Sequence, residues 1–201
     1  MNRVIELAMT GVALLYTIIS HELAHGYVAL LNGDDTAKKR GRLTWNPLAH
    51  LDPVGALCLF LFHFGWAKPV PINPYNFRHR ISGMITTSLA GVSVNLISAA
   101  ACIFLLGRIP NPPEWLSYLL QMIALYGVAF CVFNLLPIPP LDGSRIILVF
   151  LPREWREWVA QHERIIFLAA LALIATGMFD QIIRPLTTRI LNGMIRLFYA
   201  G

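Results

Sequence analysis

Charged residues are scarce in this chain of 201 residues. Asp, Glu, Lys and Arg make up 13% of it, whereas 56% of the residues are hydrophobic. A soluble domain of this size carries roughly a quarter charged residues, so the composition excludes an ordinary soluble protein. We expect an all-α polytopic protein of the lipid bilayer, with about four to six transmembrane helices.

Cysteines are also few and scattered. Cys58, Cys102 and Cys131 lie in separate apolar runs, which excludes a disulfide framework and a thiolate metal motif. The Lys and Arg residues sit in short clusters between apolar segments, where they set orientation and meet anionic lipid. Despite the net charge of +5, we therefore expect no nucleic-acid partner.

A signal-peptidase cleavage site is missing as well. Residues 1–20 carry the charge and the apolar run of a signal sequence, but no small-x-small triplet follows them. The apolar run continues into two histidines, so we interpret it as a retained span.

Four apolar segments approach the roughly twenty residues that a helix needs to cross a bilayer. They are residues 4–31, 81–107, 115–136 and 165–183. A fifth run, residues 54–66, is too short to span, and we expect a re-entrant or interfacial segment there. Residues 41–80 are rich in Pro, Asn and aromatic residues and predict extended strand or loop, because Pro69, Pro71 and Pro74 stand too close together for a helix to continue.

Lys and Arg residues flank both ends of the run 54–66, and the positive-inside rule therefore assigns both flanks to the cytoplasm. The first span then runs inward, the second outward and the third inward again. This orientation predicts that Arg40 and Arg153 are cytoplasmic and that Asn111 is outside. Residues 153–164 become a cytoplasmic surface stretch, and the tail 184–201 suits an amphipathic helix on a membrane face.

His21, Glu22 and His25 form an H-E-x-x-H motif inside the first apolar run. Positions i and i+4 of a helix share one face, so both imidazoles can bind one zinc ion while Glu22 takes a proton from its water. Each ionisable group at membrane depth costs roughly 2.5 to 3.5 kcal/mol. A role in helix packing alone does not account for three ionisable side chains at this depth. We therefore expect one zinc ion per chain.

Catalytic zinc commonly has three protein ligands and one water, so a third ligand is expected. The candidates on the cytoplasmic side are Asp34, Asp35, Asp52, Asp142, His50, His63 and His79. Asp34 and Asp35 fit a solvated turn, and Asp52 fits a cap of the short apolar run. Asp142 is favoured because it follows a span, and because Gly143 beside it allows close backbone approach.

Three ordered stretches resemble the site-2 protease family of intramembrane zinc metalloproteases. They are the H-E-x-x-H motif at residues 21–25, GVSVN at residues 91–95 and NLLPIPPLDG at residues 134–143. The stretch GWAKPVPINPYNFR also resembles the compact bacterial branch that lacks a PDZ domain. One departure is that no proline follows Gly91, where many members of the family have one.

The resemblance implies a site as well as an activity. It implies zinc on His21, His25 and Asp142, with Glu22 as the general base. It further implies that Asn95 and Asn134 support the substrate or the oxyanion, although interhelical hydrogen bonding also accounts for an asparagine beside small residues.

The function that the resemblance implies is regulated intramembrane proteolysis of a single-span substrate, which must unwind locally because helical carbonyls are tied up. Residues 66–77 are a candidate strand edge for that substrate. We expect one metalloprotease domain over residues 1–201, with a catalytic core at about 4–151 and C-terminal helices at 163–201. The expected location is the bacterial inner membrane, with the active site toward the cytoplasm. The sequence indicates neither the substrate nor the oligomeric state.

Two other functions compete with proteolysis. A membrane zinc or proton transporter predicts ionisable groups along a whole pathway, but the outward halves of these spans hold almost none. A non-catalytic zinc-binding scaffold would tolerate loss of Glu22, which is intact here.

Overall fold

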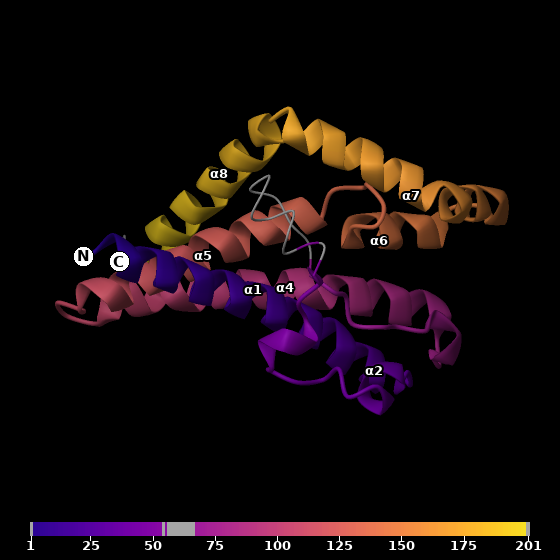
Figure 1. Cartoon of the computed structure of the whole chain (residues 1–201), viewed down its shortest axis with the longest axis horizontal. Helices are drawn as coiled ribbons and strands as arrows, with labels where there is room; N and C mark the ends of the chain where they lie inside the picture. Colours follow the sequence, from indigo (N-terminus) through magenta and orange to yellow (C-terminus); the bar gives the residue numbers. More distant parts are fainter. Residues whose placement is uncertain (1, 54, 56–66, 200–201) are drawn as a thin grey trace. The chain divides into compact units, whose positions relative to one another are not determined.

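Helices account for nearly all of the regular structure (Figure 1). The computed structural model describes residues 2–53, 55 and 67–199. Its α-helices are α1 (Arg3–Leu31), α2 (Thr36–Lys39), α4 (Arg80–Arg108), α5 (Glu114–Asn134), α6 (Asp142–Phe150), α7 (Arg153–Ala175) and α8 (Asp180–Tyr199), and its 3-10 helices are η1 (Pro47–Ala49) and η2 (Pro74–Asn76). Over these residues the strand-like pairing is one isolated antiparallel bridge between Leu51 and Ala67. The predicted all-α class is confirmed.

Three of the predicted spans are present as single helices. α1, α4 and α5 are each long and apolar enough to cross a membrane, and α4 and α5 begin within one residue of the predicted starts. Three is also the number of such helices among the described residues. The predicted re-entrant run, residues 54–66, lies outside the described residues apart from Gly55.

The fourth predicted span, residues 165–183, is wrong as a single helix. α7 ends at Ala175, and Gly177 has a φ of 73° before α8 begins at Asp180. Gly177 donates its N–H to the Ile174 carbonyl at 2.9 Å, which is how a left-handed glycine commonly closes a helix end. α7 and α8 therefore meet at an angle at this turn (Figure 1).

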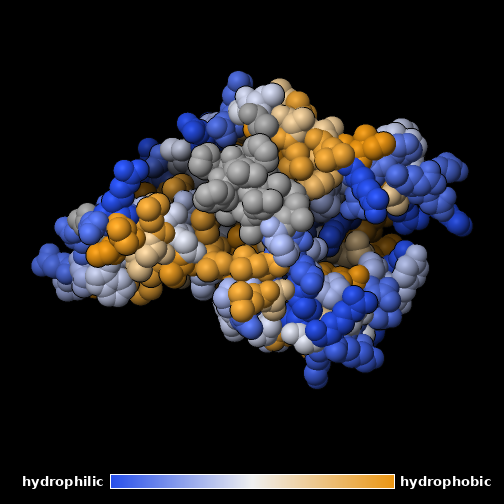
Figure 2. Space-filling view, in the orientation of Figure 1, coloured by the Kyte–Doolittle hydropathy of each residue, from blue (hydrophilic) through white to orange (hydrophobic). Residues whose placement is uncertain are grey.

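The first part of α7 carries the charge predicted for a surface stretch. Residues 153–158 are all exposed, and Arg153 pairs with Glu157 one turn along the helix. The second half is apolar, with Ile165 and Leu168 about two-thirds exposed at 65% and 64%. Figure 2 shows this change of surface along α7, from hydrophilic at its start to hydrophobic further on.

The chain folds as two compact units, Met1–Thr17 with Val92–Gly201, and Ile18–Gly91. The larger unit has its core between α4 and α5. The buried core residues are Ala99, Cys102, Ile103, Leu120, Ala124, Val128 and Val132. Tyr16 of α1 reaches the same unit through a hydrogen bond between its hydroxyl and Ser98 Oγ at 3.0 Å.

α8 lies alongside α5 in this unit (Figure 1). Its apolar residues pack against the α4–α5 core, namely Ile183, Ile190, Leu191, Met194 and Phe198. Near its end, the Tyr199 hydroxyl donates to the Ile103 carbonyl at 3.2 Å. The predicted amphipathic helix of the tail is thus present up to Tyr199, but protein rather than a membrane face covers part of its apolar side.

The smaller unit holds the second part of α1, the loops around η1 and η2, and the first part of α4. Residues 41–80 are predicted as strand or loop, and residues 67–77 within this region are loop with the single turn η2. Lys68 donates its N–H to the His50 carbonyl at 2.8 Å beside the Leu51–Ala67 bridge. These contacts fix the start of the Pro-rich segment, which then passes the second part of α1.

Candidate active site

His21 and His25 face each other on α1, as their i, i+4 spacing predicts. Each side chain is 4% exposed, and their Nε2 atoms are 2.9 Å apart. Two nitrogen ligands of one tetrahedral zinc ion, at roughly 2.0 to 2.1 Å each, lie about 3.3 Å apart. The histidine pair is therefore close to the spacing that a shared metal ion requires.

A backbone carbonyl of α4 orients the second imidazole. His25 Nδ1 is 2.7 Å from the Thr87 carbonyl oxygen. A carbonyl can only accept, so Nδ1 carries the proton and Nε2 presents its lone pair toward His21. Metal-ligating histidines are generally held in this way by a hydrogen bond from the other ring nitrogen.

Gly91 makes room for both imidazoles. A Cβ atom at this position would lie 2.6 Å from His21 Cε1 and 2.6 Å from His25 Nε2. No side chain other than hydrogen fits there without displacing a ring. The glycine that opens the GVSVN stretch thus lets the α4 backbone approach the two histidines directly.

Glu22 is held by the Pro-rich segment. Its Oε2 accepts the N–H of Val70 at 2.7 Å, and Val70 is 5% exposed. Pro69 and Pro71 flank Val70 and have no N–H of their own. The catalytic candidate next to His21 therefore has one carboxylate oxygen fixed by backbone, which leaves Oε1 as the oxygen for a reaction.

Asp142 is the first residue of α6 in the larger unit, and it is 5% exposed. A carboxylate at this position interacts favourably with the positive end of the helix dipole. Gly143 permits the local fold, because a Cβ there would lie 2.3 Å from the Leu135 carbonyl oxygen. The predicted close backbone approach beside Asp142 is confirmed.

The two asparagines lie in the larger unit, on different helices. Asn95 of α4 is 1% exposed, and Asn134 ends α5 with 9% exposed. Asn134 Nδ2 donates to the Phe130 carbonyl at 3.1 Å. A side-chain amide has two N–H donors, so this bond uses one of them.

The rival acidic ligands have contacts of their own. Asp34 is buried and accepts hydrogen bonds from Thr36, Asn73 and Asn76. Burial acts to raise the pKa of Asp34, but these hydrogen bonds outweigh it and hold the pKa below its ordinary value. Asp35 forms an exposed ion pair with Lys39 at 2.8 Å.

Asp52 and the remaining histidines also differ from the H-E-x-x-H pair. Asp52 Oδ1 accepts the Gly55 N–H at 2.8 Å, which is the predicted capping contact. His50 is buried and donates from Nε2 to the Thr44 carbonyl at 2.8 Å. His79 is exposed on the surface, and His63 lies outside the described residues.

Each of the three expected ligands is buried and offers one ligand atom: His21 and His25 lie in the smaller unit, and Asp142 lies in the larger one. Two imidazoles and a carboxylate are a donor set that suits zinc. Sequence reasoning did not find Thr87 and Val70, because each contributes a backbone group that every residue type possesses.

The family model that matches this chain describes peptidases, and the names of the similar proteins are those of zinc metalloproteases. The profile of Peptidase family M50 matches residues 79–177. A protein of Bacillus subtilis (strain 168) named "Putative zinc metalloprotease YwhC" is 37% identical over 204 residues, covering 94% of this chain and 90% of that protein.

Relatives from mycobacteria are more distant. A protein named "Putative zinc metalloprotease Rip2" from Mycolicibacterium smegmatis is 28% identical over 174 residues, covering 83% of this chain and 66% of that protein. The protein of the same name from Mycobacterium tuberculosis (strain ATCC 25618 / H37Rv) is 28% identical over 176 residues, or 81% of this chain and 65% of that protein. No solved structure matches the chain.

Proposed function

Since this chain belongs to peptidase family M50, the site-2 proteases, we propose that it cleaves peptide bonds in or near the transmembrane segments of other membrane proteins. It is a zinc metalloprotease and an integral membrane protein. The proposal extends this to the substrate, which we take to be a single-span protein whose cleavage is regulated. The single observation that carries it is the facing pair of imidazoles, with Glu22 between them in the sequence and deep in an apolar helix.

We propose that His21, His25 and Asp142 hold one zinc ion. The support is the 2.9 Å separation of the two Nε2 atoms, the proton that the Thr87 carbonyl fixes on His25 Nδ1, and the burial of all three side chains. Zinc, when bound, supplies Lewis-acid activation of water and of a peptide carbonyl. The carboxylate of Asp142 offsets part of the ion's charge in an environment of low polarity.

Glu22 is the general base in this proposal. Oε2 is held by Val70 N–H at 2.7 Å, so Oε1 takes the proton of the attacking water. The same oxygen then gives the proton to the amine that leaves when the peptide bond breaks. A carboxylate held in one position can serve both steps, because the attacking water and the leaving amine are bonded to the same carbonyl carbon and both lie close to Oε1.

Asn134 and Asn95 are proposed to stabilise the oxyanion. The second N–H of the Asn134 amide is a neutral donor of the kind that stabilises developing negative charge at a site of low dielectric. Asn95 has the same chemistry, and its burial also suits a role in helix packing. The hydrogen bond between Tyr16 and Ser98, one turn further along α4, shows that this face of α4 carries interhelical polar contacts.

The Pro-rich segment is proposed to receive the unwound substrate. The N–H groups of Lys68, Val70 and Asn73 are bound within the chain, and Pro69 and Pro71 have none. Substrate backbone would therefore pair mainly with the carbonyl groups of this segment. An extended peptide bound at such an edge presents its carbonyl groups, which a helix does not.

The site is proposed to face the cytoplasm of a bacterial inner membrane, and the two compact units are proposed to form one catalytic domain. The cations that follow α1 support the orientation, since Lys38, Lys39 and Arg40 are all exposed and cytoplasmic loops carry an excess of such residues.

Glu22→Gln tests the proposed function. The amide keeps the shape of the side chain but cannot accept a proton, so we expect loss of cleavage of a single-span substrate in liposomes with zinc content unchanged. His25→Ala is the matched variant, and it should lose both zinc and activity. Cleavage at the wild-type rate by Glu22→Gln would contradict the assignment of the general base.

A further inference from the structure

The Pro-rich segment is fixed at two points by two carboxylates. We call residues 68–76 the strap. Val70 N–H donates to Glu22 Oε2 at 2.7 Å, and three residues later Asn73 N–H donates to Asp34 Oδ2, also at 2.7 Å. One of these carboxylates belongs to the proposed general base, and the other lies just beyond the end of α1.

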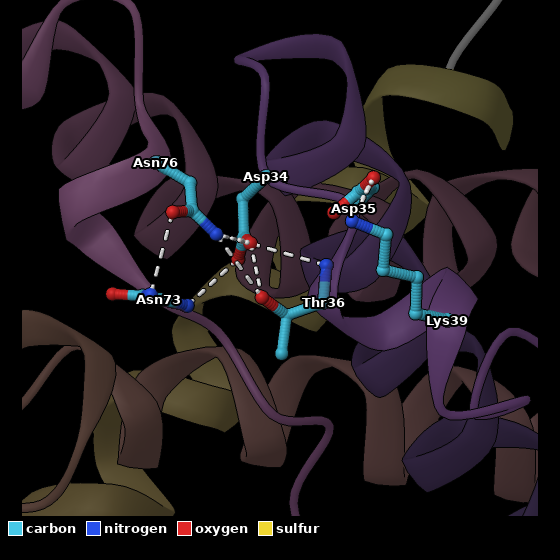
Figure 3. A network of polar contacts seen from close by, with 6 residues as sticks. All are labelled: Asp34, Asp35, Thr36, Lys39, Asn73 and Asn76. Atoms are coloured by element: carbon cyan, nitrogen blue, oxygen red, sulfur yellow. Dashed lines mark hydrogen bonds and ion pairs between the residues drawn. The ribbon is translucent and has the colours of Figure 1, made fainter.

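Asp34 is the centre of a small polar network at the far end of the strap (Figure 3). The residue is 1% exposed. Its Oδ1 accepts Asn76 Nδ2 at 2.8 Å and Thr36 N–H at 3.1 Å, and it also accepts the Thr36 hydroxyl. With Oδ2 bound to Asn73 N–H, both carboxylate oxygens are engaged by the strap and by the start of α2.

These contacts require a charged carboxylate. Every group that faces Asp34 in the network is a donor, and together they hold its pKa below the ordinary value in spite of burial. An amide at this position has a single acceptor oxygen and brings two N–H groups of its own. It would leave at least one of the part-buried donors of the strap or of Thr36 without an acceptor.

The strap is short and stiff between its two fixed points. Pro71 lies between Val70 and Asn73, and its ring fixes φ near −65°. Asn73 also caps η2, because its Oδ1 accepts the Tyr75 N–H at 3.2 Å. A shift of the strap at Asn73 is therefore transmitted to Val70 rather than absorbed by backbone rotation.

We propose that Asp34 is a positioning residue for Glu22, which it holds in the reactive orientation by fixing the strap whose Val70 N–H binds the Glu22 carboxylate. This inference rests on the proposed role of Glu22 as the general base. The hydrogen bonds of the Asp34 carboxylate go to Thr36, Asn73 and Asn76, so Asp34 acts on Glu22 through the strap. Small displacements of a catalytic group are costly, because proton transfer needs a narrow range of distance and direction.

Asp34→Asn, compared with Asp35→Asn, is the first test. Both changes remove one negative charge from adjacent positions, but the Asp35 carboxylate forms an exposed ion pair with Lys39 and, among the described residues, no hydrogen bond to the strap. We expect Asp34→Asn to lower kcat by roughly 10- to 100-fold at unchanged zinc content, and Asp35→Asn to stay within about twofold. Equal rates for the two variants would overturn the inference.

A double-mutant cycle separates positioning from a merely structural role. Val70→Pro removes the N–H that binds Glu22, whereas Val70→Ala trims the same side chain and keeps the N–H. If Asp34 acts through this N–H, Asp34→Asn should reduce kcat strongly in the Val70→Ala background and at most about twofold in the Val70→Pro background. Independent, multiplicative losses in both backgrounds would show that Asp34 does not act through Val70.

Asn76→Ala covers the case in which Asp34→Asn does not fold. It removes one donor from the network and keeps the charge of Asp34, so we expect a severalfold fall in kcat with zinc and unfolding temperature close to wild type. An unchanged kcat in Asn76→Ala would then count against the inference.

Glu22→Gln, assayed in parallel, distinguishes the two possible failures. If Glu22→Gln cleaves normally, the proposed general base is wrong, and this inference is wrong with it. If Glu22→Gln is inactive while Asp34→Asn and Asn76→Ala are fully active, only the positioning role is wrong.

Discussion

Thr87 and Gly91 lie one turn apart on α4 and serve the same two imidazoles in different ways. The Thr87 carbonyl accepts the His25 Nδ1 proton at 2.7 Å, whereas Gly91 leaves the space that the rings occupy. The first contact sets the tautomer, and the second allows the backbone to come close enough to make it. The histidine pair is thus held by a face of α4 that offers no ionisable side chain of its own.

Gly91→Ala should therefore damage the site directly. Its Cβ would lie 2.6 Å from atoms of both histidines, so one ring must rotate away. We expect zinc affinity to fall at least about tenfold, in line with other changes next to metal ligands, as measured by competition with a chelator. Gly11→Ala on α1 is the control, because no atom of the described residues lies within 4 Å of the added Cβ, and it should keep wild-type affinity.

Asp142→Asn tests the third ligand against its nearest acidic rival. A neutral amide oxygen is a poor substitute for a carboxylate on a divalent ion, so this variant should bind zinc weakly. Asp52→Asn should keep its zinc and lose at most roughly 1 kcal/mol of local stability, through its capping bond to Gly55. The measurement is the zinc content of both purified variants. Zinc retained in Asp142→Asn but lost in Asp52→Asn would assign the third ligand to Asp52.

Asp34 should also make stability depend on pH. Its pKa in the folded protein is held below the ordinary value of 3.8, so the folded state binds fewer protons than the unfolded state in this range. The stabilisation is complete above about pH 4 and is lost as pH falls through the lowered pKa. The difference in unfolding temperature between wild type and Asp34→Asn should be largest near neutral pH and narrow below about pH 4. A difference in unfolding temperature that stays the same at every pH would contradict a stabilising role of the charged Asp34 carboxylate.

At the scale of secondary structure, hydropathy predicted α1, α4 and α5 because each is a long, uninterrupted apolar helix. It failed at residues 165–183, because the mean hydropathy of this segment is apolar although the segment contains a turn between two helices. Signals for that turn were present: Gly177 follows a helical pattern, and Asp180 stands at the start of the next one. An average hydropathy over the whole segment does not register these local signals, because the apolar residues around the turn dominate it.

The residues of the candidate site also fall into those that the sequence predicts and those that it does not. His21, Glu22 and His25 could be predicted because they lie within one turn of a helix, where spacing alone fixes their geometry. Val70 and Thr87 could not, because their roles depend on backbone groups that tertiary structure brings to α1. Asp34 was interpreted as part of a solvated turn, and its burial follows from the network with Asn73 and Asn76.

At the scale of the whole molecule, the orientation in the membrane can be tested with single cysteines in a background without native cysteines. We expect cysteines at Arg40 and Arg153 to react with an impermeant reagent only from the cytoplasmic side, and one at Asn111 only from the outside. Arg40 and Asn111 are exposed, so labelling does not require unfolding. Labelling of Asn111 from the cytoplasm alone would overturn the assignment.

The packing of α8 on α4 and α5 implies an order of events during biosynthesis. About 65 residues separate the end of α5 from the end of α8, and a ribosome adds roughly 5 to 20 residues per second. The α4–α5 surface that later receives Ile190, Met194 and Phe198 is therefore made roughly 3 to 13 seconds before its cover. Lipid tails must solvate that surface first, and α8 then completes the unit by displacing them.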